Sequence, residues 1–184
     1  SAGRLAKCTL GRWQIDKSRS QPYDLTMGRE QKGADPIKFI LDVHLGKLAR
    51  WLRMLGFDTL YRNDYDDPEI VAVAAQEGRT ILTRDLGIMK RRAVTNGYHI
   101  QSTKPTEQLQ EVLSRYDLLS QIRPFHRCLV CNGLLQEVAK EAIVAQLEPK
   151  TILYYDDFFQ CASCRKIFWQ GSHFERMDRF IEKL

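Results

Sequence analysis

Between residues 37 and 120 the sequence alternates short apolar runs with longer segments in which apolar residues recur every three or four positions. Each run has strand length and each longer segment has the period of a helix. The expected strands are 37–41, 57–61, 79–83 and 98–101, and the expected helices are 43–55, 67–76, 86–94 and 106–120. Because parallel strands need a crossover connection, this alternation predicts an α/β fold with a parallel sheet flanked by helices.

Local signals support the helix ends. Gly56 and Gly78 stand where helix C-terminal caps belong. Asp67-Pro68 predicts a helix start, with Asp67 as the N-cap and Pro68 at the first helical position. Residues 1–36 lack a sustained period and are expected to be an N-terminal extension or linker, which leaves residues 37–125 as the α/β domain.

Residues 126–184 contain two C-x-x-C pairs, Cys128 with Cys131 and Cys161 with Cys164. Two thiolates on one tight turn can reach the same tetrahedral ion, so two such turns predict a structural Zn²⁺ site with four sulfur ligands. Two disulfides or four free thiols are the alternatives, but the chain begins without an apolar signal-peptide core. We expect a small zinc ribbon that ends in a helix after Ser172.

Acidic residues follow the expected strands. Asp42 comes after the first strand and Asp85 after the third, and Asp67 begins the helix after the second. Ligands of parallel sheets bind at the carboxyl ends of the strands, where three carboxylates would suit Mg²⁺ or Mn²⁺. Such an ion can hold a phosphate oxygen and activate water. Each acid could instead be a helix N-cap.

Basic residues flank these acids, in a chain of net charge +5 whose residues 126–184 are neutral overall. They would hold the phosphates of a nucleic acid, although a solvated helix face is the alternative for each. The candidate nucleic-acid-binding residues are Lys47, Arg50, Arg53, Arg84, Lys90, Arg91 and Arg92. His44, two residues after Asp42, is a further candidate for contact with substrate.

The segments Asp42-Val43-His44-Leu45-Gly46-Lys47-Leu48-Ala49-Arg50-Trp51-Leu52-Arg53-Met54-Leu55-Gly56-Phe57-Asp58-Thr59 and Glu77-Gly78-Arg79-Thr80-Ile81-Leu82-Thr83-Arg84-Asp85 resemble the mutator-seven C-terminal RNase domain family. The resemblance extends over about residues 37–184. It implies a PIN-like fold followed by a four-cysteine zinc ribbon, and an activity on RNA. Asp42, Asp67 and Asp85 match the acidic positions of the family pattern, with Asp64 and Glu69 nearby as substitutes.

The leading hypothesis is therefore a metal-dependent ribonuclease, with an endonucleolytic cut, located in the cytoplasm. The alternative is a catalytically weak or inactive RNA-binding or adaptor module, because PIN nucleases usually present a fourth acid and residues 86–106 contain none. A protein partner at exposed aromatic residues is a third hypothesis. No segment approaches the roughly 20 apolar residues of a membrane span, so no membrane partner is expected.

Overall fold

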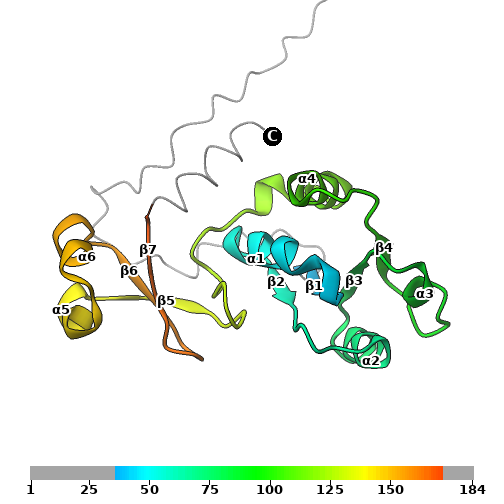
Figure 1. Cartoon of the computed structure of the whole chain (residues 1–184), viewed down its shortest axis with the longest axis horizontal. Helices are drawn as coiled ribbons and strands as arrows, with labels where there is room; N and C mark the ends of the chain where they lie inside the picture. The colour runs from blue at the N-terminus through cyan, green and yellow to red at the C-terminus, as the bar shows by residue number, and fades with distance from the viewer. Residues whose placement is uncertain (1–35, 172–184) are drawn as a thin grey trace, which may run out of the picture.

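The computed structural model describes residues 36–171, and its first part, the α/β unit (residues 38–121), is built on a parallel sheet. The strand order is β2-β1-β3-β4 (Figure 1). The strands are β1 (Lys38–Leu41), β2 (Asp58–Leu60), β3 (Thr80–Thr83) and β4 (Gly97–His99). All three pairings are parallel, which confirms the predicted fold class.

Helices cover both faces of this sheet. They are α1 (Gly46–Met54) after the 3₁₀ turn η1 (Val43–Leu45), α2 (Asp67–Glu77), α3 (Leu86–Met89) and α4 (Pro105–Arg115) before η2 (Leu119–Gln121). Phe39 and Leu41 pack with α1 and α4, whereas Ile40 packs with α2 and α3 on the other face. Successive residues of a strand point to opposite faces, so a fully apolar β1 supplies both cores.

Two predicted helices are shorter than expected. The helix predicted at 86–94 ends with α3 at Met89, because the following Lys90-Arg91-Arg92 run is exposed and has no apolar side to bury. The helix predicted at 106–120 ends at Arg115, and Asp117 then adopts a left-handed φ of 50°. That turn brings Leu118 into the core.

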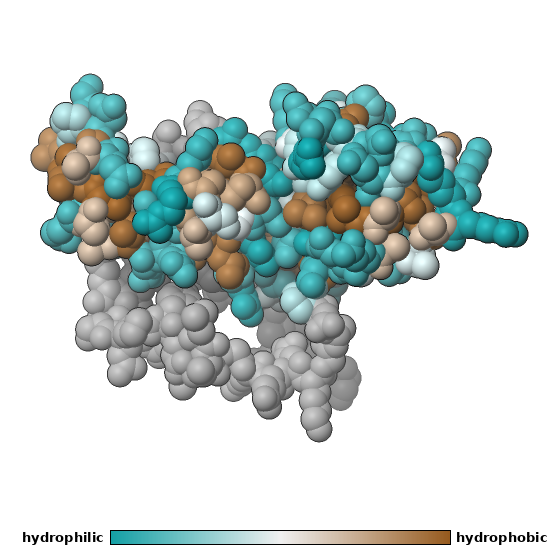
Figure 2. All heavy atoms as spheres, turned by 90° about the horizontal axis from the view of Figure 1, so that it is seen from below, coloured by the Kyte–Doolittle hydropathy of each residue, from teal (hydrophilic) through white to brown (hydrophobic). Residues whose placement is uncertain are grey.

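The second part, the cysteine ribbon (residues 126–169), has an antiparallel sheet in the order β5-β6-β7. Its strands are β5 (Leu135–Val138), β6 (Phe158–Cys161) and β7 (Ile167–Trp169). Between β5 and β6 lie α5 (Lys140–Ile143), η3 (Val144–Gln146) and α6 (Pro149–Tyr154). Helix α6 was not predicted from the sequence, although Pro149 stands at its first position. Figure 2 shows hydrophobic residues gathered at this end of the molecule, where Leu153 and Tyr154 are 74% and 71% exposed.

The aromatic residues expected to form an exposed patch for a protein partner were Phe158, Phe159 and Trp169, and they do not form an open patch. Phe158 is buried, Phe159 stacks on Phe125, and Trp169 is the one of these three that reaches an exposure of 36%. The predicted helix after Ser172 and the extension before Pro36 lie outside the described residues. Among the described helices, none combines the length and apolar character needed to cross a membrane.

Candidate functional site

The candidate site lies where β1 and β3, neighbours in the sheet, reach their carboxyl ends. Asp42 directly follows β1 and is 3% exposed. Its Oδ1 accepts a hydrogen bond from the backbone N–H of His44 at 2.8 Å. Its Oδ2 accepts from the backbone N–H of Arg84 at 2.8 Å and from the Thr83 hydroxyl. The carboxylate is thus fixed in place by donors from both strand ends.

Thr83, the last residue of β3, connects the two acids. Its fully buried side chain donates to Asp42, and its hydroxyl oxygen accepts from the backbone N–H of Asp85 at 2.8 Å. The Asp85 side chain is exposed and caps α3 by accepting from Gly87 N–H at 2.6 Å. Asp85 is therefore a helix cap, one of the two roles considered from the sequence, and it also presents an exposed carboxylate at a strand end.

Asp67 occupies a different position from the one expected. The N-cap of α2 is Asp66, not Asp67, because Asp66 and Glu69 form a reciprocal capping box with contacts of 2.8 and 3.1 Å. The D-x-x-E spacing in the sequence was the signal for this box. Asp67 instead pairs with Arg91, which follows α3, at 3.2 Å between half-exposed side chains.

The three acids do not close around one point in this structure. Within residues 36–171, the four cysteines are the one group of three or more His, Cys, Asp or Glu residues whose ligand atoms all lie within 4.8 Å of one another. Carboxylates are the ligands that Mg²⁺ and Mn²⁺ prefer, so the chemistry of the acids fits such an ion while their present spacing does not enclose one.

The two substitute acids have other partners. Asp64 makes a two-pronged contact with Arg62 at 2.6 and 2.9 Å on the surface, and this contact lowers the pKa of Asp64. Glu69 is used in the capping box of α2. The structure thus gives each of them a local role near the start of α2.

The candidate RNA-binding residues divide into exposed and buried ones. Those that are exposed lie on α1 and around α3, and they are Lys47, Arg50, Arg84, Lys90, Arg91 and Arg92. Arg53 differs, because it is 5% exposed and its guanidinium donates to backbone carbonyls of residues 59, 61, 129 and 130. A phosphate cannot reach a guanidinium that is occupied in this way, so Arg53 is a structural residue.

Residues that the sequence analysis did not use also lie at this edge. His99 ends β4, and its Nε2 is 3.2 Å from the carbonyl oxygen of Arg84. Glu111 of α4 accepts from Tyr98 Oη at 2.7 Å and from the N–H groups of Gln101 and Ser102. Burial opposes the ionisation of Glu111, but these donors lower its pKa. His44, a predicted candidate, has an exposed side chain beside Asp42.

The four cysteines converge as predicted. The Sγ atoms of Cys128 and Cys164 are 3.6 Å apart, and those of Cys131 and Cys161 are 3.4 Å apart. Sulfurs in a tetrahedral site with Zn–S bonds of about 2.3 Å lie about 3.8 Å apart. The donor set and its spacing therefore fit a zinc ion. None of these four cysteines forms a disulfide in the structure.

The two cysteine turns repeat one backbone pattern. Asn132 N–H donates to the Cys128 carbonyl, and Arg165 N–H donates to the Cys161 carbonyl, both at 3.0 Å. Asn132 and Arg165 adopt left-handed φ values of 66° and 61°. The two C-x-x-C pairs of the sequence thus form turns of the same backbone structure.

Comparison with protein families gives one match, to a model described as the Mut7-C RNAse domain, which covers residues 37–181. The match includes the α/β unit, both cysteine turns and every candidate residue named above. Comparisons with curated proteins and with solved structures find no match.

Proposed function

Because the chain belongs to the Mut7-C RNAse domain family, we propose that it cleaves RNA phosphodiester bonds at the carboxyl edge of its parallel sheet, with Asp42 and Asp85 as the central acids. The observation that carries this proposal is the shared Thr83 contact. The Thr83 hydroxyl contacts the buried carboxylate of Asp42 and the backbone N–H of Asp85, so the two acidic residues are tied together at neighbouring strand ends. The cut is proposed to be endonucleolytic, and a cytoplasmic location remains a prediction from the sequence.

A divalent cation, Mg²⁺ or Mn²⁺, would be held by Asp42, Asp67 and Asp85. When bound, it would neutralise charge on the scissile phosphate and lower the pKa of a water molecule. Asp67 must exchange its Arg91 partner to take part. That ion pair is half-exposed, and such pairs contribute about 0–1 kcal/mol, so the exchange costs little.

The chain's own side chains have separable roles in this proposal. Asp42 is held rigidly and supplies an oriented negative charge, whereas Asp85 faces solvent and can meet the substrate. The exposed Lys47 and Arg50 on α1 and Arg84 after β3 would bind backbone phosphates. The zinc ribbon contributes structure, since residues 126–184 have no excess of positive charge.

Asp85→Asn is the sharpest test of cleavage. Asn also caps helices well, so this change removes the charge and keeps the contact to Gly87. Asp42→Asn is a less specific test, because it also disturbs the fold. Three donors bind the two carboxylate oxygens of Asp42, and an amide offers only one acceptor oxygen. We expect Mn²⁺- or Mg²⁺-dependent cleavage of a labelled structured RNA that EDTA and Asp85→Asn both abolish, with RNA binding retained.

The matched control is Asp117→Asn. Asp117 is exposed at the end of α4, and its φ of 50° suits Asn equally well. This variant should cleave like the wild type. Cleavage that survives in Asp85→Asn at the wild-type rate would refute the assignment of the acids.

A second candidate function is RNA binding without catalysis. The observation that favours it is the open arrangement of the three acids, which do not form a ligand group in this structure. This hypothesis predicts RNA binding that weakens with salt and needs no metal, and no cleavage of the labelled RNA with Mn²⁺, Mg²⁺ or EDTA.

A further inference from the structure

The cysteine ribbon is attached to the α/β unit along the free edge of β2. In the strand order β2-β1-β3-β4, β2 is an edge strand whose outer backbone groups have no strand partner. Such an edge exposes unpaired N–H and C=O groups. At Thr59, the outer N–H donates to Asn132 Oδ1 at 2.9 Å, and the outer carbonyl accepts from Arg53 Nε at 2.8 Å.

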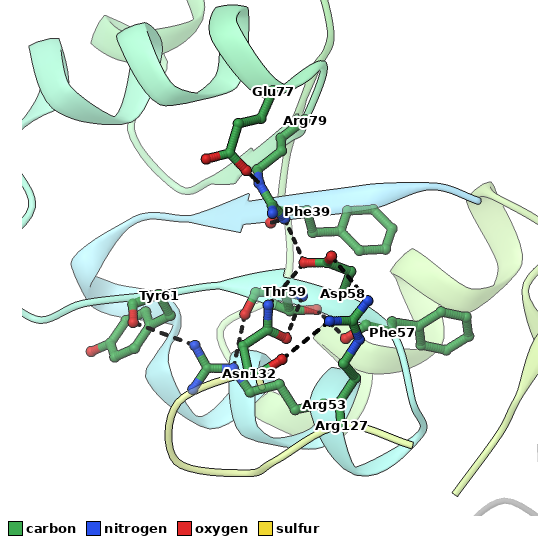
Figure 3. Close-up of polar contacts among 10 residues, drawn as sticks. All are labelled: Phe39, Arg53, Phe57, Asp58, Thr59, Tyr61, Glu77, Arg79, Arg127 and Asn132. Atoms are coloured by element: carbon green, nitrogen blue, oxygen red, sulfur yellow. Dashed lines mark hydrogen bonds and ion pairs between the residues drawn. The ribbon is translucent and has the colours of Figure 1, made fainter. Parts of the chain in front are cut away.

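The same two side chains hold the first cysteine turn. Arg53 Nη1 donates to the carbonyls of Leu129 and Val130 at 3.3 and 3.0 Å, and these residues lie between Cys128 and Cys131. Asn132 directly follows Cys131 and is 6% exposed. One guanidinium and one amide therefore bridge the edge of the parallel sheet and the loop that carries two of the four sulfurs (Figure 3).

A partly buried charged group, the carboxylate of Asp58, completes this junction. Asp58 Oδ1 accepts from Asn132 Nδ2 at 2.8 Å and from Arg79 Nη1 at 2.6 Å, and Asp58 Oδ2 pairs with Arg127 at 3.1 Å. Arg127 directly precedes Cys128. Both ends of the first cysteine turn are thus bonded to residues of the α/β unit.

The second cysteine turn offers an internal comparison. Arg165 occupies the position that corresponds to Asn132, with the same backbone pattern, but it is exposed. Within residues 36–171, no hydrogen bond joins the side chain of Arg165 to the α/β unit. The contact to the sheet is therefore specific to the first turn.

We propose that Arg53 and Asn132 couple zinc binding at the four cysteines to the closure of the β2 edge, so that each stabilises the other. This inference goes beyond the proposed nuclease function, and it concerns a metal site other than the catalytic one. A zinc ion fixes the first turn in the shape that presents Asn132 Oδ1 to Thr59. Conversely, Arg53 orders the carbonyls of that turn before the ion arrives. Linkage makes the two effects equal in free energy.

The first experiment measures zinc affinity by competition with a chromophoric chelator. Groups that orient metal ligands typically contribute about 10–100-fold to affinity, and we expect a loss in this range for Asn132→Gly. Glycine accepts the left-handed φ at this position, so the change removes the amide without backbone strain. The control is Arg165→Gly at the equivalent position of the second turn, which should bind zinc like the wild type.

Arg53→Met tests the second half of the bridge and keeps the length of the side chain. Its control is Arg50→Met, one turn earlier on α1 at an exposed position. If Arg53→Met does not fold, Arg53→Lys keeps the charge and removes the planar fork. Wild-type zinc affinity in Asn132→Gly and in a folded Arg53 variant would overturn the proposal.

The reciprocal experiment measures amide hydrogen exchange in the wild-type protein with and without zinc. Loss of zinc should speed exchange at Thr59, whose N–H is bonded to Asn132, by the same factor that the bridge adds to zinc affinity. Asp42 N–H, bonded to the Leu82 carbonyl inside the sheet at 3.1 Å, reports whether the effect spreads. Faster exchange at Thr59, alone or with Asp42, supports coupling. Unchanged protection at Thr59 after zinc removal overturns it. Neither readout depends on RNA cleavage, so a failure here is distinguishable from a failure of the nuclease assignment.

Discussion

Asp58→Asn should destabilise the protein strongly, because Asp58 pairs with the buried Arg79 and the partly buried Arg127. Its carboxylate contacts Arg79 at 2.6 Å and Arg127 at 3.1 Å, and the three side chains are 16%, 7% and 21% exposed. Removing one partner of a buried ion pair costs about 3–5 kcal/mol. Arg79 also keeps a contact to the half-exposed Glu77 at 2.7 Å, so we expect the lower end, about 3 kcal/mol.

The assay is urea unfolding, with thermal unfolding as a second readout. For a chain of this size, 1 kcal/mol corresponds to about 2–4 °C, so the midpoint should fall by roughly 6–12 °C. The control is Asp64→Asn, which removes the exposed contact to Arg62. A midpoint for Asp58→Asn that equals that of the control would refute the claim that this junction stabilises the fold.

The same variant has a defined dependence on pH. Burial opposes the ionisation of Asp58, but hydrogen bonds from Arg79 and Asn132 and the charges of Arg79 and Arg127 lower its pKa below the ordinary value. A lowered pKa in the folded state gives stability above the unfolded pKa of about 3.9, and this stability is lost as the pH falls through the folded pKa. The difference in the free energy of unfolding between wild type and Asp58→Asn should therefore become smaller in acid. A constant gap from neutral pH to about pH 3 would contradict this cause.

Three further predictions concern single positions. Gly56→Ala should lower the free energy of unfolding, measured in urea, by at least about 2 kcal/mol, because φ is 94° and a Cβ would collide with the backbone oxygen of Arg123. Gly78 has a φ of 64° and open space around it, so Gly78→Ala should lower this free energy by about 1 kcal/mol. Equal losses would show that the collision is relieved. Thr83→Val removes the hydrogen bond to the buried Asp42, so it should lower the free energy of unfolding by about 1.5–3 kcal/mol and reduce cleavage. Thr83→Ser keeps the hydroxyl and should retain both stability and cleavage. A fully active Thr83→Val variant would contradict this positioning role. Arg50→Gln should lower the slope of log RNA affinity against log salt by about 1, as filter binding at several salt concentrations would show, and an unchanged slope would remove Arg50 from the RNA surface.

Much of the α/β unit could be predicted because its signals are local. The apolar run of β1, the period of α1 and the glycine after α2 each depend on a few neighbouring residues. The position of Asp42 and Asp85 at strand ends follows from the same alternation. The N-cap of α2 was misassigned to Asp67 although its local signal, the Asp66 and Glu69 pair, was present in the sequence.

The predicted roles of the charged residues were less secure, because a charge has no period that reveals its partner. Lys47, Arg50 and Arg53 are equally spaced, yet the first two are exposed and the third is buried against carbonyls from a segment more than 70 residues away. No local pattern marks Thr83, a hydroxyl residue at the end of the buried strand β3, as a partner of Asp42. The importance of Thr83 depends on the pairing of β1 with β3.

The sequence by itself therefore determined the order of strands and helices in the α/β unit, the acids at the ends of β1 and β3 and the four cysteines that cluster in the ribbon. These depend on periodicity and on spacings of two or three residues, which physical chemistry constrains locally. Only the tertiary structure decided that β2 lies at an edge of the sheet, and that Arg53, Asp58 and Asn132 close this edge against the first cysteine turn. Strand order depends on packing between residues far apart in the sequence. The groups that pair with the edge of β2 are therefore known only once the whole sheet is known.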